Sequence, residues 1–131
     1  MSIEYQEEPG LTAHDFLALA RRIWPRHYDS DKTTAALRRT INITARFNGQ
    51  LIGAVRVLTD GYFFGTIPEI LVDPSHQRHG IGSRLMQLAW ERSPTSLFFG
   101  AQPGNEPFFE KLGFSQSIQS YSKRKPKPED P

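Results

Sequence analysis

The sequence predicts an α/β protein built on a mixed sheet with helices on its faces. In the first half, two β-like segments flank Asn48-Gly49, a dipeptide favoured in two-residue hairpin turns because both central residues need a positive φ. In the second half, apolar segments alternate with segments of helical periodicity, the order typical of α/β folds. At 131 residues, the chain is long enough for one hydrophobic core without disulfides.

The N-terminal elements are predicted from helical spacing, a cap and a breaker. Ile3–Glu7 is a candidate first strand. Thr12 is a candidate N-cap for a helix over Ala13–Trp24, in which apolar residues recur at helical spacing. Pro25 ends this helix, and Asp31–Thr40 forms a second, weaker helical pattern.

The central segments predict most of the sheet. Ile41–Phe47 and Gln50–Leu58 are the two strands of the hairpin, and Asp60-Gly61 marks the next turn. Ile67–Val72 is apolar on both faces, which favours a central strand. Because Pro68 cannot donate a ladder hydrogen bond, we expect the pairing of this strand to be interrupted there.

The C-terminal half predicts two more helices and two more strands. A helix is expected over residues 80–92 and an apolar strand over Ser96–Ala101. Asn105–Leu112 predicts a short helix that ends at Gly113, and Ser115–Ser122 is expected to be the last strand. We therefore expect one domain over residues 1–122, followed by a basic, proline-containing tail over residues 123–131.

Charge is unevenly distributed along the chain. The net charge is +2, and the tail over residues 123–131 accounts for it with four basic and two acidic side chains. The neutral remainder argues against a nucleic-acid partner.

The composition also excludes several classes of site and location. The chain has no cysteine, which rules out disulfides, thiolate nucleophiles and Cys-ligated metals. No apolar run approaches the roughly 18 residues that a membrane span requires, and the N-terminus lacks the features of a secretory signal. We expect a cytoplasmic protein without a membrane partner.

The segment Gln77-Arg78-His79-Gly80-Ile81-Gly82 is the most informative part of the chain. It follows a predicted strand and opens a predicted helix, where unpaired amides and the helix dipole favour a phosphate group. Two glycines allow close approach to the main chain. A Rossmann fingerprint would need a third glycine, and a Walker loop would need Gly-Lys-Ser/Thr. An ordinary strand–loop–helix turn is the remaining alternative for this segment taken alone.

The hexapeptide resembles the Gln/Arg-x-x-Gly-x-Gly/Ala signature of the GNAT superfamily of acetyltransferases. Upstream, Leu71-Val72-Asp73-Pro74 resembles the family's V-x-P strand exit. Downstream, the stretch Asn105-Glu106-Pro107-Phe108-Phe109-Glu110-Lys111-Leu112-Gly113-Phe114 is similar to the family's N…FYEKLGF segment. The resemblance is close over Ile67–Phe114.

This resemblance implies a mostly antiparallel central sheet, splayed between two parallel strands that match Ile67–Val72 and Ser96–Ala101, with helices on both faces. It also implies acetyl-CoA as co-substrate, with its pantetheine arm between those strands, and no metal. His76 and His79, three residues apart beside Asp73, could suggest a metal site, but their adjacency to the phosphate-binding segment argues against it. Asn105 has an alternative role as an N-cap. The residues implied to contact acetyl-CoA are Leu71, Val72, Gln77, Arg78, His79, Gly80, Ile81, Gly82, Ser83, Asn105, Phe108, Phe109 and Lys111.

The implied reaction is direct attack of a primary amine on the thioester in a ternary complex, and we expect a small-molecule acceptor. Glu69 matches a position where some members have a catalytic base; its alternative role is an ion pair with an arginine. Phe109 stands where many members have a tyrosine that protonates the thiolate, so Tyr121 or Tyr62 is a candidate acid. A non-catalytic CoA-binding sensor or interaction module of the same fold is the alternative function.

Family acceptors bind near the loop after the first helix and near the turn that follows the hairpin. In this sequence both segments are aromatic, and the alternative is that Trp24, Phe63 and Phe64 complete the core. Homodimerisation is a further possibility because the last predicted strand looks too short to close the sheet. The candidate acceptor-binding residues are Trp24, His27, Tyr28, Tyr62 and Phe63.

Overall fold

The computed structural model of the chain describes residues 2–126. The chain divides into two compact units between Phe99 and Gly100. The expected single domain over residues 1–122 stays a prediction, and most of the predicted tail, residues 127–131, lies outside the described residues.

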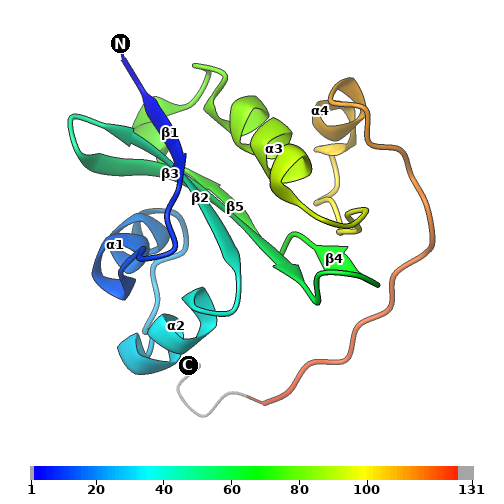
Figure 1. The fold of residues 1–131 in the computed structure, drawn as a ribbon, viewed down its shortest axis with the longest axis horizontal. Helices are drawn as coiled ribbons and strands as arrows, with labels where there is room; N and C mark the ends of the chain where they lie inside the picture. Colours follow the sequence, from blue (N-terminus) through cyan, green and yellow to red (C-terminus); the bar gives the residue numbers. More distant parts are fainter. Residues whose placement is uncertain (1, 127–131) are drawn as a thin grey trace. The chain divides into compact units, whose positions relative to one another are not determined.

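The first unit contains an antiparallel sheet (Figure 1). Its order is β1-β2-β3-β4, and β5 also pairs with β3. Every named pair of strands is antiparallel, while Thr66 and Phe98 form one parallel bridge. The predicted mixed α/β fold with a mostly antiparallel sheet is therefore confirmed. The strands are β1 (Glu4–Glu7), β2 (Ile41–Phe47), β3 (Gln50–Thr59), β4 (Gly65–Thr66) and β5 (Ile70–Val72).

The hairpin between β2 and β3 turns at the predicted dipeptide. Asn48 and Gly49 have φ values of 51° and 79°, as a two-residue turn of this type requires. The register shifts between Ala45 and Arg46, so the hairpin contains an irregularity just before its turn. Local sequence alone specified this connection.

The helices of the first unit begin at polar caps or at a glycine. Helix α1 (Ala13–Ile23) starts after Thr12, whose Oγ1 accepts a hydrogen bond from the Asp15 amide at 3.1 Å, which confirms the predicted cap. Helix α2 (Ser30–Leu37) starts earlier than expected because Asp29 accepts from the Lys32 amide. Helix α3 (Ile81–Arg92) begins after Gly80.

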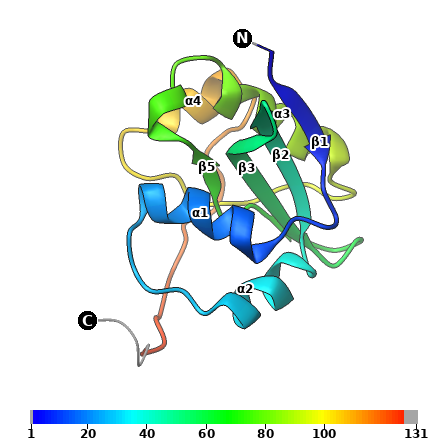
Figure 2. The same ribbon diagram turned by 90° about the vertical axis from the view of Figure 1, so that its left-hand side faces the viewer.

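Helices cover both faces of the sheet. Helices α1 and α2 lie on one face and α3 on the other (Figure 1), and in Figure 2, where α1 faces the viewer, the strands lie behind it. Side chains of α1 share a buried cluster with Leu51, Ala54 and Leu71 of the sheet. On the opposite face, a Cβ at Gly53 would lie 3.0 Å from Ile81 and 3.1 Å from Leu85. This close contact fixes the first turn of α3 directly on β3.

Of the strand predicted over Ile67–Val72, only the second half, β5 (Ile70–Val72), is in a strand. Pro68 lies between β4 and β5, and no residue from 67 to 69 belongs to a strand. The predicted interruption of pairing at this proline is therefore confirmed. A short 3₁₀ helix, η1 (Pro74–His76), follows β5 and leads toward α3.

Two predicted strands are wrong. Within Ser96–Ala101, Phe98 alone forms a bridge, and its amide donates to the Gly65 carbonyl at 3.0 Å. Side-chain hydrogen bonds between Ser93 and Thr95 compete with an extended ladder just before this segment. No residue of Ser115–Ser122 is in a strand, because strand propensity without a partner edge does not form a ladder.

The second unit contains one helix among its described residues, α4 (Glu106–Lys111). Asn105 occupies its N-cap position but makes no capping hydrogen bond through its side chain. Instead, Oε1 of Glu106 accepts from the Gly104 amide at 2.6 Å. Gly113 has a φ of 93° just beyond the helix, as its predicted role as terminator requires. Among residues 2–126, no helix is both long and apolar enough to cross a bilayer.

Candidate functional site

A run of unused backbone amides lies between β5 and α3. From Gln77 to Ser83, no backbone N–H donates to another described residue, and the first bond of α3 runs from the Arg84 amide to the Gly80 carbonyl at 3.1 Å. We call residues 77–83 the amide loop. Since α3 has no side-chain cap, these donors face solvent or a ligand. Such a cluster at a helix N-terminus is suited to an anion.

The backbone of the amide loop leaves room for a bound diphosphate. Arg78 and Gly80 have left-handed φ values of 69° and 73°. A Cβ built on Gly80 would meet nothing within 4 Å, so the space beside this residue is open. Residues 77–80 are exposed, and the side chains of Arg78 and His79 make no hydrogen bond or ion pair with other described residues. The unused amides, the open space and the guanidinium of Arg78 fit the pyrophosphate of CoA.

The main chain of β5 offers a second set of binding groups. The Asp73 amide donates to the Ile52 carbonyl at 2.8 Å, and the Arg56 amide donates to the Glu69 carbonyl at 3.4 Å. Because an antiparallel ladder alternates, Leu71 also turns its polar groups toward β3, while Ile70 and Val72 turn theirs away. Within residues 2–99, no strand pairs with that outer edge. The main-chain groups on the free edge of β5 therefore belong to Ile70 and Val72, whereas those of Leu71 face β3.

Asp73 is the buried anchor of the segment that leads to the amide loop. Its side chain is inaccessible to solvent, and Oδ1 accepts from both the amide and the hydroxyl of Ser75, each at 2.9 Å. Its Oδ2 forms an ion pair with Arg22 of α1 and lies 3.6 Å from His76 Nδ1. Burial alone raises the pKa of this carboxyl, but the Ser75 hydrogen bonds and the charges of Arg22 and His76 outweigh it and lower the pKa.

This lowered pKa predicts how Asp73→Asn changes stability with pH. The ionised carboxylate contributes stability above its unfolded pKa of about 3.9, and the contribution disappears as pH falls through the lower folded-state pKa. At pH 7 we expect the variant to lose on the order of 2 kcal/mol, because charge-assisted hydrogen bonds are weakened. Urea unfolding of both proteins from pH 7 to 3 measures the difference. A deficit of the same size at pH 3 and pH 7 would contradict this assignment.

Glu69 forms a two-point ion pair with Arg56 of β3. The Arg56 Nε and Nη2 atoms lie 2.5 and 2.7 Å from the two carboxylate oxygens of Glu69. Both side chains are largely buried, with 16% and 17% of their surfaces exposed. The guanidinium carbon of Arg56 also lies 5.8 Å from the centre of the Phe16 ring. The predicted alternative, an ion pair, is present, and each carboxylate oxygen retains a further lone pair for a water molecule.

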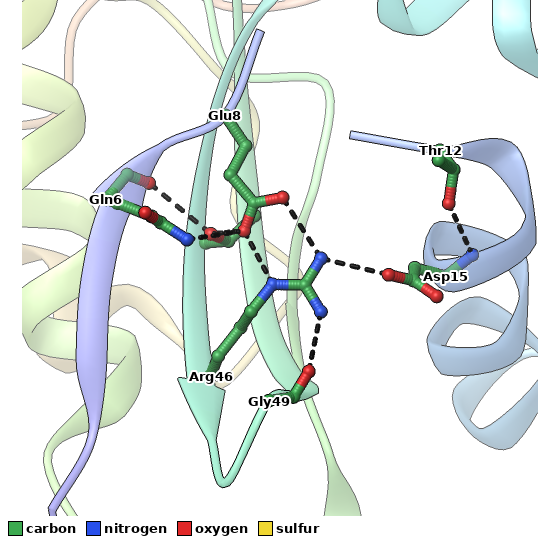
Figure 3. Close-up of polar contacts among 7 residues, drawn as sticks. Gln6, Glu8, Thr12, Asp15, Arg46 and Gly49 are labelled. Carbon is green, nitrogen blue, oxygen red and sulfur yellow. Dashed lines mark hydrogen bonds and ion pairs between the residues drawn. The ribbon is translucent and has the colours of Figure 1, made fainter. Parts of the chain in front are cut away.

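A second arginine–carboxylate cluster joins Glu8, the residue after β1, to Arg46 of β2 and Asp15 of α1 (Figure 3). Arg46 Nε lies 2.6 Å from Glu8, and Nη2 lies 3.0 Å from Asp15. Thr44 also donates to Glu8 at 2.6 Å. The hydrogen bond from Arg46 is the main cause that lowers the pKa of Glu8, and the pKa of Arg46 is raised in return. Like Arg56–Glu69, this cluster pairs a guanidinium with both oxygens of a glutamate, so it provides a control for substitutions at Glu69.

The aromatic residues predicted at the acceptor side are on the surface. Trp24 is 51% exposed, and Tyr62 and Phe63 are 79% and 82% exposed. The alternative that Trp24, Phe63 and Phe64 complete the core is therefore wrong. The Tyr28 hydroxyl donates to the Trp24 carbonyl at 2.9 Å, and His27 is exposed. No hydrogen bond, ion pair or ring contact connects residues 24–28 with residues 60–64 in the described structure.

The loop that carries Tyr62 and Phe63 is shaped by Asp60. Its Oδ1 atom accepts from the amides of Tyr62, Phe63 and Phe64 at 2.9, 2.8 and 3.1 Å. These hydrogen bonds, led by that of Tyr62, lower the pKa of Asp60. The Phe64 ring also stacks on Phe98 with centres 5.7 Å apart. The turn therefore presents its aromatic side chains from a defined backbone.

Comparison with protein families identifies the chain. The model of the acetyltransferase (GNAT) domain matches residues 39–116, which include β2 to β5, the amide loop and α4. The chain belongs to the GNAT acetyltransferase family. It is accordingly an acyltransferase of the N-acetyltransferase type, a family that uses acetyl-CoA.

Solved structures of GNAT proteins share the fold of the chain. A GNAT family protein from Streptococcus pneumoniae is 21% identical, with a TM-score of 0.79, and the match covers 95% of this chain and 100% of that one. Glucosamine-6-phosphate N-acetyltransferase from Arabidopsis thaliana is 14% identical over 95% and 99% of the chains, with a TM-score of 0.76. AAC(6')-Iy, solved with a bisubstrate analogue of CoA and acetylneamine, is 17% identical over 96% and 99%, with a TM-score of 0.75.

Five residues that the GNAT resemblance implied lie in the second unit. Phe108 and Phe109 of α4 make an edge-to-face contact with ring centres 5.0 Å apart. Tyr121 is 92% exposed, and Asn105 does not use its side chain to cap α4. The roles of Asn105, Phe108, Phe109, Lys111 and Tyr121 toward acetyl-CoA stay predictions.

Sequence analysis missed several residues of this site. Arg56 and Arg22 pair with Glu69 and Asp73 across 13 and 51 residues of sequence, a separation that no local pattern reveals. Ile70 could have been predicted from the sequence. Because a strand has a period of two, the main-chain groups of Ile70 and Val72 face the same edge. Among the described residues, no group of three His, Asp or Glu side chains lies close enough to hold a metal ion.

Proposed function

We propose that this GNAT protein transfers the acetyl group of acetyl-CoA to a primary amine of a small molecule by direct attack in a ternary complex. The observation that carries the proposal is the amide loop, whose unused donors lie between β5 and the start of α3. A diphosphate linkage satisfies such donors and benefits from the positive end of the helix dipole.

The donor site uses main-chain groups of the first unit. The amides of the amide loop hold the pyrophosphate, and the Arg78 guanidinium adds positive charge beside it. The outer edge of β5, through Ile70 and Val72, pairs with the amides of the pantetheine arm in the manner of an added strand. When bound, acetyl-CoA supplies an activated acetyl carbon that a neutral amine can attack.

Glu69 receives the proton that the acceptor must lose. An alkyl ammonium with a pKa of about 10.4 is protonated at neutral pH, so its nitrogen has no free lone pair until a base removes a proton. Glu69 accepts this proton through a water molecule while Arg56 holds its carboxylate in position. The neutral amine then attacks the thioester carbonyl, so that the C–N bond forms and the C–S bond breaks. The extra proton on the nitrogen passes to the departing thiolate, which leaves as the free thiol. A thiol of pKa about 8.5 is a fair leaving group even without an acid.

Two features support a small amine as the acceptor. The exposed aromatic residues Trp24, Tyr62 and Phe63 supply apolar surface on the two connections where the resemblance places the acceptor. The names of two structural neighbours also include small amines or their conjugates. One is glucosamine-6-phosphate N-acetyltransferase, and the other was solved with an acetylneamine conjugate. The predicted homodimer, the cytoplasmic location and the absence of a nucleic-acid partner stay predictions.

A panel of amines tests this function. The purified protein is incubated with acetyl-CoA and either amino sugars, polyamines, amino acids or peptides, and release of free thiol is followed. We expect thiol release that depends on both the protein and a small amine. In parallel, acetyl-CoA at 100 times its dissociation constant should stabilise the fold by about 2.7 kcal/mol. Tight binding without turnover of any amine would favour a CoA-binding module, and turnover of peptides alone would overturn the small-molecule acceptor.

A further inference from the structure

Asp73, the first residue after β5 on the way to the amide loop, is held by three parts of the first unit. The Asp73 amide donates to Ile52 on β3. Its carboxylate binds Arg22 in the last turns of α1 and accepts two hydrogen bonds from Ser75 in η1. A fully buried carboxylate is unfavourable unless it is paired in this way. The chain that leaves β5 is therefore anchored at Asp73.

The amide loop has few anchors of its own. Among the described residues, the side chains of Gln77, Arg78 and His79 make no hydrogen bond or ion pair, and all three are exposed. At its C-terminal side, the loop is held where Ile81 enters the core with 1% of its surface exposed. At the other side, the nearest buried attachment is Asp73. The path of the exposed loop between these two points depends on how firmly each is held.

We infer that the Arg22–Asp73 ion pair positions the amide loop for CoA and fastens it to α1. The inference rests on the proposed function and assigns two positioning residues, since neither side chain is placed against the ligand. Without the guanidinium, the carboxylate keeps its Ser75 bonds but loses its link to α1, and the loop samples more conformations before binding. Ordering these conformations on binding lowers the affinity for CoA.

An ion pair that only stabilises the fold would behave differently, and the chain offers a matched control. Arg46 also binds a carboxylate, that of Glu8, and its side chain is 16% exposed against 45% for Arg22. If stability alone set the affinity for CoA, Arg46→Met would weaken binding at least as much as Arg22→Met. Arg22→Lys retains the charge but not the planar guanidinium, so partial recovery is expected from it.

The experiment is calorimetric titration of CoA into the wild-type protein, Arg22→Met, Arg22→Lys and Arg46→Met, with urea unfolding of each without ligand. We expect the Kd for CoA to rise about tenfold for Arg22→Met, to recover partly for Arg22→Lys and to change less than twofold for Arg46→Met. A Kd for Arg22→Met within twofold of wild type, or an equal loss for Arg46→Met, overturns the inference alone. A wild-type protein that binds no CoA overturns the proposed function as well.

Discussion

Replacing Gly80 by valine should abolish CoA binding at concentrations that saturate the wild-type protein. Gly80 has a φ of 73°, and a β-branched residue in this region is strained by about 1–3 kcal/mol. We expect the loop to relieve this strain by rotating its peptide groups. The amide N–H groups that bind the pyrophosphate then no longer point to the same place. The new side chain also enters the open space beside the main chain. We expect Kd to rise at least about 100-fold, equivalent to about 2.8 kcal/mol.

Gly49→Val is the control that separates strain from binding. Gly49 has a φ of 79° in the hairpin turn, and a Cβ there also meets nothing within 4 Å. Both variants should therefore lose comparable stability in urea, whereas only Gly80→Val should lose the heat of CoA binding in a titration. Gly80→Val with wild-type affinity would remove the amide loop from the site. An equal loss of affinity in Gly49→Val would show that global strain, not the loop, is responsible.

Glu69→Gln should lower kcat by a factor of about 100 or more and leave the affinity for CoA unchanged. Removing a general base typically costs this much, because the amine then waits for solvent to take its proton. Glutamine has nearly the shape of glutamate and can still accept one hydrogen bond from Arg56, so the fold should persist. The measurement is thiol release at saturating acetyl-CoA with the best amine of the panel. A calorimetric titration of CoA accompanies it.

Glu8→Gln is the matched control for this substitution. Glu8, the residue after β1, also binds an arginine with both carboxylate oxygens, at 2.6 and 3.0 Å, but the proposed reaction does not use this pair. Its loss should reduce stability without changing kcat. If kcat of Glu69→Gln stays within threefold of wild type, Glu69 is a structural partner of Arg56. In that case the amine loses its proton elsewhere.

Local chemistry explains why much of the fold could be predicted. Thr12 caps α1, Asn48 and Gly49 turn the hairpin, and Pro68 interrupts the strand between β4 and β5. Each effect depends on the backbone preferences or the side-chain oxygen of one or two residues. Such preferences act in any tertiary context that does not oppose them.

The wrong predictions concern elements whose existence depends on a partner. Ser96–Ala101 and Ser115–Ser122 have strand-like composition, yet the first forms one bridge at Phe98 and the second forms none. A strand is stabilised by the ladder on its neighbour, so propensity alone cannot show whether an edge is available. The sequence likewise allowed Trp24 and Phe63 to be core residues, whereas the structure places both at the surface.

The sequence by itself determined the family and the amide loop, because the glycines, the strand exit and the start of α3 lie within a few consecutive residues. Only the tertiary structure decided which groups surround that loop. It turned the polar groups of Ile70 rather than Leu71 toward the free edge of β5, paired Glu69 with Arg56, and joined Asp73 to Arg22. Strand register and long-range ion pairs arise from the packing of distant segments, which sequence order does not record.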